Sequence, residues 1–312
     1  MTRAGLTNLA ASVHRRLLNL SQTRGENFNL LLVQYALERF LYRLVQSGYA
    51  HQFVLKGALL FVIWRLKEHR PTRDLDLLGY GDSSPEVLDR LFRNICAVEA
   101  EDGLIFHPDS VRVREIREEQ EYGGQRVHLV ATLGQARIPL QIDIGFGDAI
   151  TPAAEEVEYP TLLGFPALRL RAYTKETVVA EKLQSMVMLG ILNSRMKDFY
   201  DIWALSQQFP FDGRILAQAI RATLERRRTE LPQTPPVALT PQFAQEPSKI
   251  TQWKAFLRRN QLDVGGADLA QIVDLLGHFL LPPLAAIADG RGFAGRWPPG
   301  GPWVVGDRTS VV

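Results

Sequence analysis

The sequence predicts an α+β protein in which a small mixed β-sheet, flanked by helices, precedes a helical C-terminal half. Three observations predict this fold. Apolar residues follow a helical period in the first fifty residues, alternate with polar residues between 104 and 146, and return to a helical period after residue 174. With 46% hydrophobic and 22% charged residues, the 312-residue chain has the composition of a globular protein.

The first half is predicted to hold an N-terminal helical segment, residues 1–50, and an α/β core, residues 51–172. Arg70-Pro71 and Asp102-Gly103 are helix-ending signals within this core. The elements expected in the core are, in chain order, a strand over 53–55, a helix over 58–66, an extended segment over 72–78, a helix over 85–100, strands between 104 and 146, and a last strand over 167–172.

The second half is predicted to be a helical domain, residues 173–287, followed by a Gly/Pro-rich tail, residues 288–312. A linker rich in Pro and Gln, 231–242, divides it, and Pro282-Pro283 is expected to end the last helix. The tail is expected to be poorly ordered or to lie on the surface. The helices expected are 174–189, 197–207, 213–228, 248–260 and 267–281.

The composition excludes several classes of protein. With 36 Lys and Arg against 34 Asp and Glu, the net charge is +2, so nucleic acid could be bound only by a local basic patch. The most basic block is residues 1–50, with six Arg against two Glu. A single cysteine, Cys96, excludes a disulfide framework and a multi-cysteine zinc site, and it indicates a reducing, cytoplasmic compartment.

The apolar runs do not predict a membrane protein. The run Leu59–Trp64 is too short to span a bilayer, and the run over 279–288 is interrupted by two prolines. The amphipathic start of the chain lacks the uninterrupted apolar core of a signal peptide.

The sharpest motif is Arg73-Asp74-Leu75-Asp76-Leu77. In a strand, residues i and i+2 share a face, so Asp74 and Asp76 would point the same way while the leucines pack into the core. Like charges side by side repel unless a cation lies between them, and Mg²⁺ suits such a site. Thr72, two residues before Asp74, would place its hydroxyl on the same face, although its β-propensity is the simpler explanation.

A third carboxylate is predicted from Leu140–Phe146. Its apolar residues alternate, which puts Asp143 on the opposite, polar face. If this strand neighbours 72–78, Asp143 joins the pair, and three carboxylates on adjacent strands are typical of metal-dependent phosphoryl or nucleotidyl transfer. A solvated face would explain Asp143 as well.

Lys56-Gly57-Ala58 lies where a strand turns into a helix. Small residues there let backbone N–H groups approach a phosphate at the helix N-terminus. The Walker A pattern is absent, and a plain connection is the simpler interpretation.

Two further groups lie in the helical half. Lys175 and Lys182 are seven residues apart on one predicted helix and so share a side, from which a lysine could neutralise nucleotide phosphates. Asp198 and Asp201 are three apart on the next helix. Stabilisation of the helix N-terminus is the alternative explanation for Asp198.

Taken together in this order, these segments resemble the AbiEii/AbiGii-type nucleotidyltransferase toxins, which include the MenT enzymes, within the DNA-polymerase-β-like nucleotidyltransferase superfamily. The resemblance covers about half of the chain, 53–203. The matching stretches are FVLKGALLFVIWRL, RPTRDLDLL, IPLQIDIGF, TKETVVAEKLQSMV and RMKDFYDIW.

The resemblance implies transfer of a nucleotidyl group from an NTP with two Mg²⁺ ions, or Mn²⁺, by a mixed sheet and a helical half that closes the nucleotide cleft. It implies the 3′ end of tRNA as acceptor, arrested translation, and a cognate antitoxin, often in phage defence. The implied site residues are Asp74 and Asp76 as metal ligands with Asp143 assisting, Lys182 as a catalytic phosphate contact, Asp198 as the acidic residue of the last motif, and Lys56, Gly57, Ala58 and Thr72 on the nucleotide side.

The sequence departs from the family pattern at Ala58, where a hydroxyl is absent, so a phosphate contact there would use the backbone only. Residues beyond about 205 match nothing, which leaves the acceptor open. A small molecule such as an aminoglycoside, or a protein side chain, is an alternative acceptor, and an inactive nucleotide-binding protein is a third interpretation. The arginines of residues 1–50 and Arg226–Arg228 favour a polyanionic acceptor.

Overall fold

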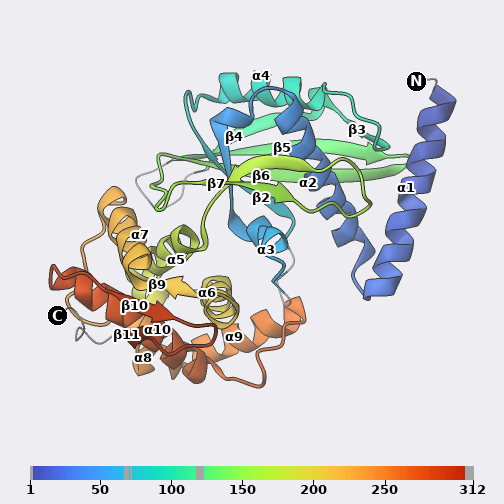
Figure 1. Cartoon of the computed structure of the whole chain (residues 1–312). Coiled ribbons are helices and arrows are strands. Elements are labelled where there is room, and N and C mark those ends of the chain that lie inside the picture. The colour runs from blue at the N-terminus through green and yellow to red at the C-terminus, as the bar shows by residue number, and fades with distance from the viewer. Residues whose placement is uncertain (1–2, 67–69, 71, 117–122, 306–312) are drawn as a thin grey trace, which may run out of the picture. The chain divides into compact units, whose positions relative to one another are not determined.

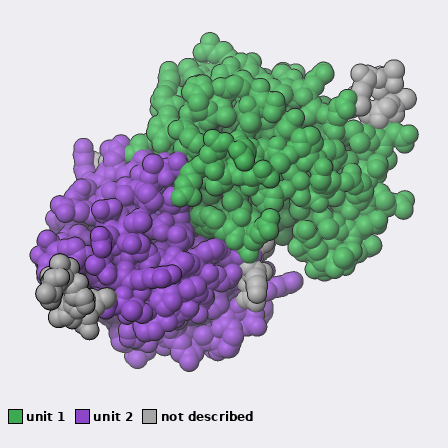
Figure 2. Space-filling view, viewed as in Figure 1, with its two compact units in different colours: residues 1–65, 71–147, 155–172 green, residues 66–70, 148–154, 173–312 purple. Residues whose placement is uncertain are grey.

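The structure is a computed structural model and describes residues 3–66, 70, 72–116 and 123–305. It divides into two compact units, coloured separately in Figure 2. Unit 1 holds residues 1–65, 71–147 and 155–172, and unit 2 holds 66–70, 148–154 and 173–312. Unit 1 contains a mixed β-sheet with helices and unit 2 is mostly helical, so the predicted α+β fold class is confirmed.

Unit 1 is built on an eight-stranded mixed sheet, whose central strands β6, β2 and β5 cross the upper part of Figure 1. The order along the sheet is β3-β5-β6-β2-β1-β8-β7, with β4 paired to β5. The pairs β2–β6 and β1–β8 are parallel and the others antiparallel. The strands are β1 Phe53–Lys56, β2 Asp74–Gly79, β3 Leu104–Phe106, β4 Arg112–Ile116, β5 Gly124–Leu133, β6 Ala136–Phe146, β7 Glu155–Tyr159 and β8 Leu168–Ala172.

Helices pack against one face of this sheet through an apolar core. Phe40 of α2 stacks on Phe92 of α4 with ring centroids 5.8 Å apart and contacts Phe106 of β3 at the same distance. On the sheet itself, Leu129 and Ile142 are buried, as the alternating sequence pattern requires. The helices of unit 1 are α1 Arg3–Arg24, α2 Phe28–Gln46, α3 Leu60–Ile63 and α4 Pro85–Cys96.

Some boundaries in unit 1 differ from prediction. The apolar stretch after Gly57 was predicted to be one helix over 58–66, but it is a 3₁₀ turn, Gly57–Leu59, followed by the single-turn helix α3. Helix α4 ends at Cys96 rather than near residue 100. Strand β7 was not predicted, because its sequence EEVEY is charged and lacks apolar alternation.

Unit 2 is a bundle of helices with a small three-stranded sheet, β11-β10-β9. Helix α5 packs on α7, and α10 packs on both α6 and α7. The helices are α5 Lys175–Leu189, α6 Met196–Gln208, α7 Gly213–Arg226, α8 Pro241–Ala244, α9 Pro247–Asn260 and α10 Leu269–Ala288. The strands are β9 Phe211–Asp212, β10 Gly295–Trp297 and β11 Val304–Val305.

Helix α10 does not end before Pro282-Pro283, as predicted, but continues through both prolines. A proline removes the hydrogen bond to the carbonyl four residues earlier. For Pro283 that carbonyl belongs to Phe279, and it accepts a hydrogen bond of 2.9 Å from Trp303 Nε1 instead. A distant part of the chain thus satisfies a group that the proline leaves without its helical partner.

Helix α10 is also the one element of the described chain with the length and apolar composition of a membrane span. Half of the most apolar part of this helix is buried inside the protein, and core helices of globular proteins have the same length and composition. It is therefore weak evidence for a membrane segment.

The segments predicted as linker and tail both pack into unit 2. Within the linker, Ala238 and Leu239 are buried, and Phe243, directly after it, stacks on Phe199 with ring centroids 5.1 Å apart. Within the tail, buried Trp297 donates a hydrogen bond of 2.8 Å to the Ser206 carbonyl and contacts Phe279. The expectation of a poorly ordered tail is wrong through residue 305, because Trp297 and Trp303 pack against Phe279 of α10. Most other tail residues are exposed, which agrees with the alternative expectation that the tail lies on the surface; residues 306–312 lie outside the described part of the chain.

Candidate functional site

The carboxylates of β2 lie as the alternation predicts. Asp74 and Asp76 are half-buried, whereas Leu75 and Leu77 between them are fully buried on the opposite face of the strand. The two acidic side chains therefore share one face of the sheet, and the leucines anchor the strand from behind.

The strand register brings further charged residues beside Asp76. Lys56 of β1 is paired with Asp76 on one side, and Asp143 of β6 is paired with it on the other. Arg126 of β5 is in turn paired with Asp143. Across the four adjacent strands β1, β2, β6 and β5, one row of side chains therefore places two acidic residues between two basic residues.

Asp143 is bound by Arg126 through two parallel contacts. Arg126 Nε lies 2.7 Å from Asp143 Oδ1, and Arg126 Nη2 lies 2.7 Å from Oδ2. Gln141 Nε2 also donates to Asp143, at 3.3 Å. This forked geometry is the strongest type of Arg–carboxylate pair and fixes the orientation of Asp143.

Among the described residues, no three His, Cys, Asp or Glu side chains are close enough together to hold a metal ion. The three carboxylates are therefore not gathered into one coordination shell in this structure, in which Arg126 engages Asp143. The role of Asp143 as an assisting ligand stays a prediction. Asp74 and Asp76 nevertheless fit Mg²⁺, which takes one or two protein carboxylates and completes its shell with water and phosphate oxygens.

Gly57 forms a close approach of backbone to the Asp76 carboxylate. Its φ is +75°, which favours glycine, and a Cβ atom added there would lie 2.0 Å from Asp76 Oδ2. A side chain at this position would therefore collide with the Asp76 side chain. The glycine of the Lys-Gly-Ala turn is therefore required sterically, because it lets the backbone lie directly against this carboxylate.

The neighbours of these residues have clear local roles. Ala58 is buried, so only its backbone can serve a ligand. The Thr72 hydroxyl bonds locally, donating to the Asp74 carbonyl at 3.2 Å and accepting from the Asp74 N–H at 3.3 Å. Thr72 thus shapes the entry to β2, and its contact with a nucleotide remains a prediction.

A second charged group lies within unit 2. Lys182 of α5 contacts two carboxylates of α6, with Nζ 2.7 Å from Asp198 Oδ1 and 2.9 Å from Asp201 Oδ2. Arg195 Nε lies 2.7 Å from Asp198 Oδ2, and Arg70 Nε lies 3.1 Å from Asp201 Oδ1. We call these five residues the Lys182 cluster.

The Lys182 cluster keeps its charges. Burial by itself lowers the pKa of Lys182, but Asp198 and Asp201 outweigh it and raise this pKa above its usual value. Burial raises the pKa of Asp198, but the attraction of Lys182 and Arg195 is larger than this effect, so the pKa of Asp198 is lowered overall. Lys182 is therefore an ammonium and Asp198 a carboxylate throughout the neutral range.

Lys175, which shares a side of α5 with Lys182 in sequence, has different surroundings. Its Nζ pairs with Glu176 at 2.8 Å and lies 5.2 Å from the centroid of the Phe211 ring. The residues that sequence reasoning missed are Arg70, Arg126 and Arg195. Arg70 and Arg195 lie next to the recognised motifs and could have been suspected, whereas the pairing of Arg126 depends on strand register.

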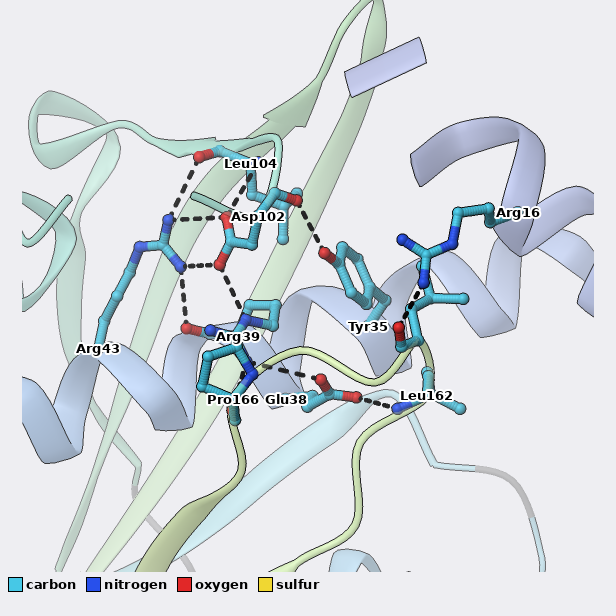
Figure 3. Close-up of polar contacts among 10 residues, drawn as sticks. Arg16, Tyr35, Glu38, Arg39, Arg43, Asp102, Leu104, Leu162 and Pro166 are labelled. Carbon is cyan, nitrogen blue, oxygen red and sulfur yellow. Dashed lines mark hydrogen bonds and ion pairs between the residues drawn. The ribbon is translucent and has the colours of Figure 1, made fainter. Parts of the chain in front are cut away.

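The predicted basic flank of residues 1–50 is partly internal. Figure 3 shows Arg39 and Arg43 of α2 directed at Asp102, with Arg39 Nε 2.8 Å from Oδ2 and Arg43 Nη1 2.6 Å from the same oxygen. All three side chains are at most 2% exposed, and we call them the Asp102 cluster. Arg227 of the second predicted basic group is likewise paired with Asp148 at 2.9 Å. These three arginines do not form an RNA-binding surface.

The comparisons with known proteins bear on this arrangement. The sequence matches the family described as "Nucleotidyl transferase AbiEii toxin, Type IV TA system" over residues 39–274. No curated protein matches the chain. The crystal structure of JHP933 from Helicobacter pylori is 15% identical with a TM-score of 0.45, covering 81% of this chain and 88% of that one. A candidate nucleotidyltransferase from H. pylori is 15% identical with a TM-score of 0.44, covering 81% and 91%.

The chain belongs to the AbiEii nucleotidyl transferase toxin family of type IV toxin–antitoxin systems, since the match spans most of its length. The resemblance inferred from the motifs is thereby confirmed. The matched region contains both charged groups described above, the β2 carboxylates of unit 1 and the Lys182 cluster of unit 2.

Proposed function

We propose that this AbiEii-family protein is an Mg²⁺-dependent nucleotidyltransferase that transfers NMP from an NTP to RNA, at the 3′ end of tRNA, and so blocks translation. In this proposal it acts in the cytoplasm as the toxin of a toxin–antitoxin or abortive-infection system. Family membership supports the nucleotidyl transfer and a cognate antitoxin. The metal, the acceptor and the compartment are parts of the proposal.

The observation that carries the proposal is the setting of Asp76. It shares a face with Asp74, Lys56 lies beside it in register, and the Gly57 backbone approaches its carboxylate where a Cβ would lie 2.0 Å from Oδ2. Two carboxylates on one face, a cation and a glycine turn at the start of a helical segment are groups that suit a metal-bound triphosphate.

Each residue has a separate task in the transfer. When bound at Asp74 and Asp76, Mg²⁺ would stabilise charge on the α-phosphate and on the attacking oxygen. The reaction joins the acceptor oxygen to the α-phosphorus and breaks the α-phosphorus bond to the bridging oxygen, so that pyrophosphate leaves and the hydroxyl proton passes to water. The Gly57-Ala58 backbone would bind phosphate oxygens.

Lys182 would offset negative charge on the phosphates, as the family resemblance implies. The pairing with Asp198 and Asp201 supports this role because both carboxylates keep Lys182 protonated and fix the position of its ammonium group. In this view Asp198 is a positioning residue for Lys182. The assignment rests on charge and on the motif rather than on a contact with substrate.

The test is label transfer by the purified full-length protein. Each α-³²P-labelled NTP is incubated with Mg²⁺ and total RNA, and the label is measured separately in RNA, protein and small-molecule pools. We expect label in RNA, and we expect Asp76→Ala to abolish it. The matched control is Asp109→Ala, which removes an exposed carboxylate in the same unit and should leave labelling unchanged.

Other outcomes would redirect the assignment. Label in the small-molecule or protein pool alone would replace RNA with that acceptor while keeping the transfer chemistry. NTP binding by calorimetry without any label transfer would indicate an inactive nucleotide-binding protein. Transfer that survives Asp76→Ala would remove this residue from the metal site.

A further inference from the structure

Two rows of side chains cross the sheet of unit 1 from the β2 carboxylates towards β4. They are set by the registers β2–β6, β6–β5 and β5–β4. The first row is Asp76, Asp143, Arg126 and Arg114, and the second row is Asp74, Gln141, His128 and Arg112.

All of these side chains lie on one face, because residues paired across neighbouring strands point the same way. On β5 the intervening Val127 and Leu129 are buried, and Ile142 on β6 is buried with them. In contrast, His128, Arg112 and Arg114 are exposed. The rows therefore lie on the open face of the sheet, opposite its apolar core.

Charge is segregated along this open face. The acids of the two rows are confined to β2 and β6, whereas the bases lie on β5 and β4, with Arg137 at the other end of β6 on the same face. Asp143 is already paired with Arg126. Arg114 and Arg137 form no ion pair or hydrogen bond with any residue in the described ranges through their side chains, so their charge is uncompensated there.

This distinguishes them from the arginines of the Asp102 cluster, which are buried and fully engaged. Arg112 is exposed but partly engaged by the backbone. Its Nη1 donates to the Asp109 carbonyl at 2.8 Å and to the Val111 carbonyl at 2.7 Å. A guanidinium has five donors, so donors remain for an anion. We call Arg112, Arg114, His128 and Arg137 the basic strip.

We propose that the basic strip binds the phosphodiester backbone of the RNA acceptor and leads its terminal hydroxyl to the β2 carboxylates; the inference rests on the proposed function. Neighbouring strands are about 4.8 Å apart, so Arg114, three strands from Asp76, is displaced by roughly 14 Å. Arg137, six residues before Asp143 on β6, is displaced by about 20 Å along the strand. A repeating polyanion spans such distances, whereas a small acceptor does not.

The chemistry also favours nucleic acid. Arginine binds phosphate oxygens through two parallel N–H donors, and phosphate contacts position a nucleic acid without reading its sequence. Charged side chains on an edge strand have another use, which is to prevent pairing with a second sheet. That use needs charge at the edge only and does not require His128, which lies on β5 between Arg112 of β4 and Gln141 of β6.

The experiment compares the full-length protein with the R112A/R114A variant, using deacylated tRNA and labelled NTP. We expect the KM for tRNA to rise about 10-fold while the KM for NTP is unchanged. The slope of log binding constant against log salt should fall by about 1 to 2, since each lost phosphate contact removes about one unit. R112K/R114K should restore most of the affinity, and R90A, an exposed arginine on α4 of the same unit, is the control.

Each outcome separates the inference from the proposed function. Labelling of tRNA by the R112A/R114A variant with unchanged KM and salt slope overturns the basic strip and leaves the transferase intact. No RNA labelling by the unaltered protein overturns the proposed function. A KM that rises for a protein or small-molecule acceptor and not for tRNA assigns the strip to that class instead. Thermal melting of both variants excludes misfolding as the cause.

Discussion

The Asp102 cluster and the Lys182 cluster use the same interactions at different depths. In the first, Arg39 and Arg43 bind one carboxylate, and no member is more than 2% exposed. In the second, Asp198 and Asp201 are equally buried, but Lys182 is 14% and Arg195 is 41% exposed. The first cluster is closed to solvent, whereas the second leaves its cations partly exposed.

The environment of the Asp102 cluster explains its closure. Tyr35 donates to the Asp102 carbonyl at 2.7 Å, Arg39 Nη1 to the Pro166 carbonyl at 3.1 Å, and Arg43 Nη2 to the Leu104 carbonyl at 3.3 Å (Figure 3). These bonds join α2 to segments far along the chain. A buried ion pair whose remaining donors end on backbone carbonyls therefore contributes to folding. Lys182 is partly exposed, which is consistent with the phosphate contact proposed for it.

The largest effect is expected from Asp102→Ala. Removing this carboxylate leaves two guanidinium groups buried without their partner, which costs about 3–5 kcal/mol of unfolding free energy. Urea unfolding followed by tryptophan fluorescence measures it. A loss below about 1 kcal/mol would contradict the structural role of this cluster.

The next effect is on activity. We expect Lys182→Met to lower label transfer by about 10²–10³-fold, the cost typical of a lost charge-stabilising donor. Its stability loss should be smaller than that of Asp102→Ala, because Asp198 keeps Arg195 and Asp201 keeps Arg70.

The matched control is Lys175→Met, seven residues earlier on the same helix, where Nζ pairs with Glu176 instead. Equal losses of transfer for both lysines would show that the effect comes from the helix rather than from the Lys182 cluster.

The two clusters should also differ in pH dependence. Beside the Asp102 cluster, burial raises the pKa of Glu38 to about 7, against the lowering effects of the Leu162 N–H and Arg39. Folded Glu38 thus holds its proton where the unfolded chain has lost it, so stability is greatest below the usual pKa and falls as pH rises through 7. We expect a loss of about 2 kcal/mol between pH 5 and pH 7 from this group.

Glu38→Gln should flatten that dependence, because the amide oxygen can still accept the 2.8 Å bond from Leu162 N–H. The Lys182 cluster gives no such slope in this range. The pKa of Asp198 is lowered, so its contribution is lost only as pH falls below the usual carboxyl range. An unchanged slope in the Gln variant would remove Glu38 as its source.

The smallest effect is expected from Arg221→Ala. Arg221 Nε lies 2.8 Å from Glu225 Oε1, the same separation as Arg39 Nε and Asp102 Oδ2, but both side chains are 65% exposed. Solvent screens an exposed pair, so the loss should be about 0.3–0.5 kcal/mol. Thermal unfolding of Arg221→Ala and Asp102→Ala compares two ion pairs of equal length and different burial. Equal losses of unfolding free energy would show that burial does not decide how much an ion pair contributes.

Local patterns predicted much of unit 1. Alternation placed Asp74 and Asp76 on one face of β2 with Leu75 and Leu77 behind, and the order of motifs identified the family. The assumption that Asp143 lies beside β2 also agrees with the register, in which it pairs with Asp76. These patterns could not predict that Arg126 binds both carboxylate oxygens of Asp143. That contact depends on the register between β5 and β6, which the sequence of neither strand determines alone.

Elsewhere, local signals were misleading. Pro282-Pro283 normally ends a helix, and a Gly/Pro-rich tail is normally loose, yet Trp303 bonds to the carbonyl freed by Pro283 and Trp297 packs beneath α10. The two exceptions depend on each other. Neither can be predicted from the neighbouring sequence, because the Phe279 carbonyl and the Trp303 N–H that bind each other are more than twenty residues apart.

The sequence by itself determined the fold class, the family and the face on which Asp74 and Asp76 lie, because these depend on periodicity and on the order of short motifs. The tertiary structure decided how the charges are used. The 36 basic and 34 acidic residues nearly balance in number, but they have different environments. Some form buried pairs such as Arg39–Asp102, some form partly exposed pairs such as Lys182–Asp198, and others form the exposed basic strip. Burial sets the strength of each charge, and burial arises only when distant segments pack together.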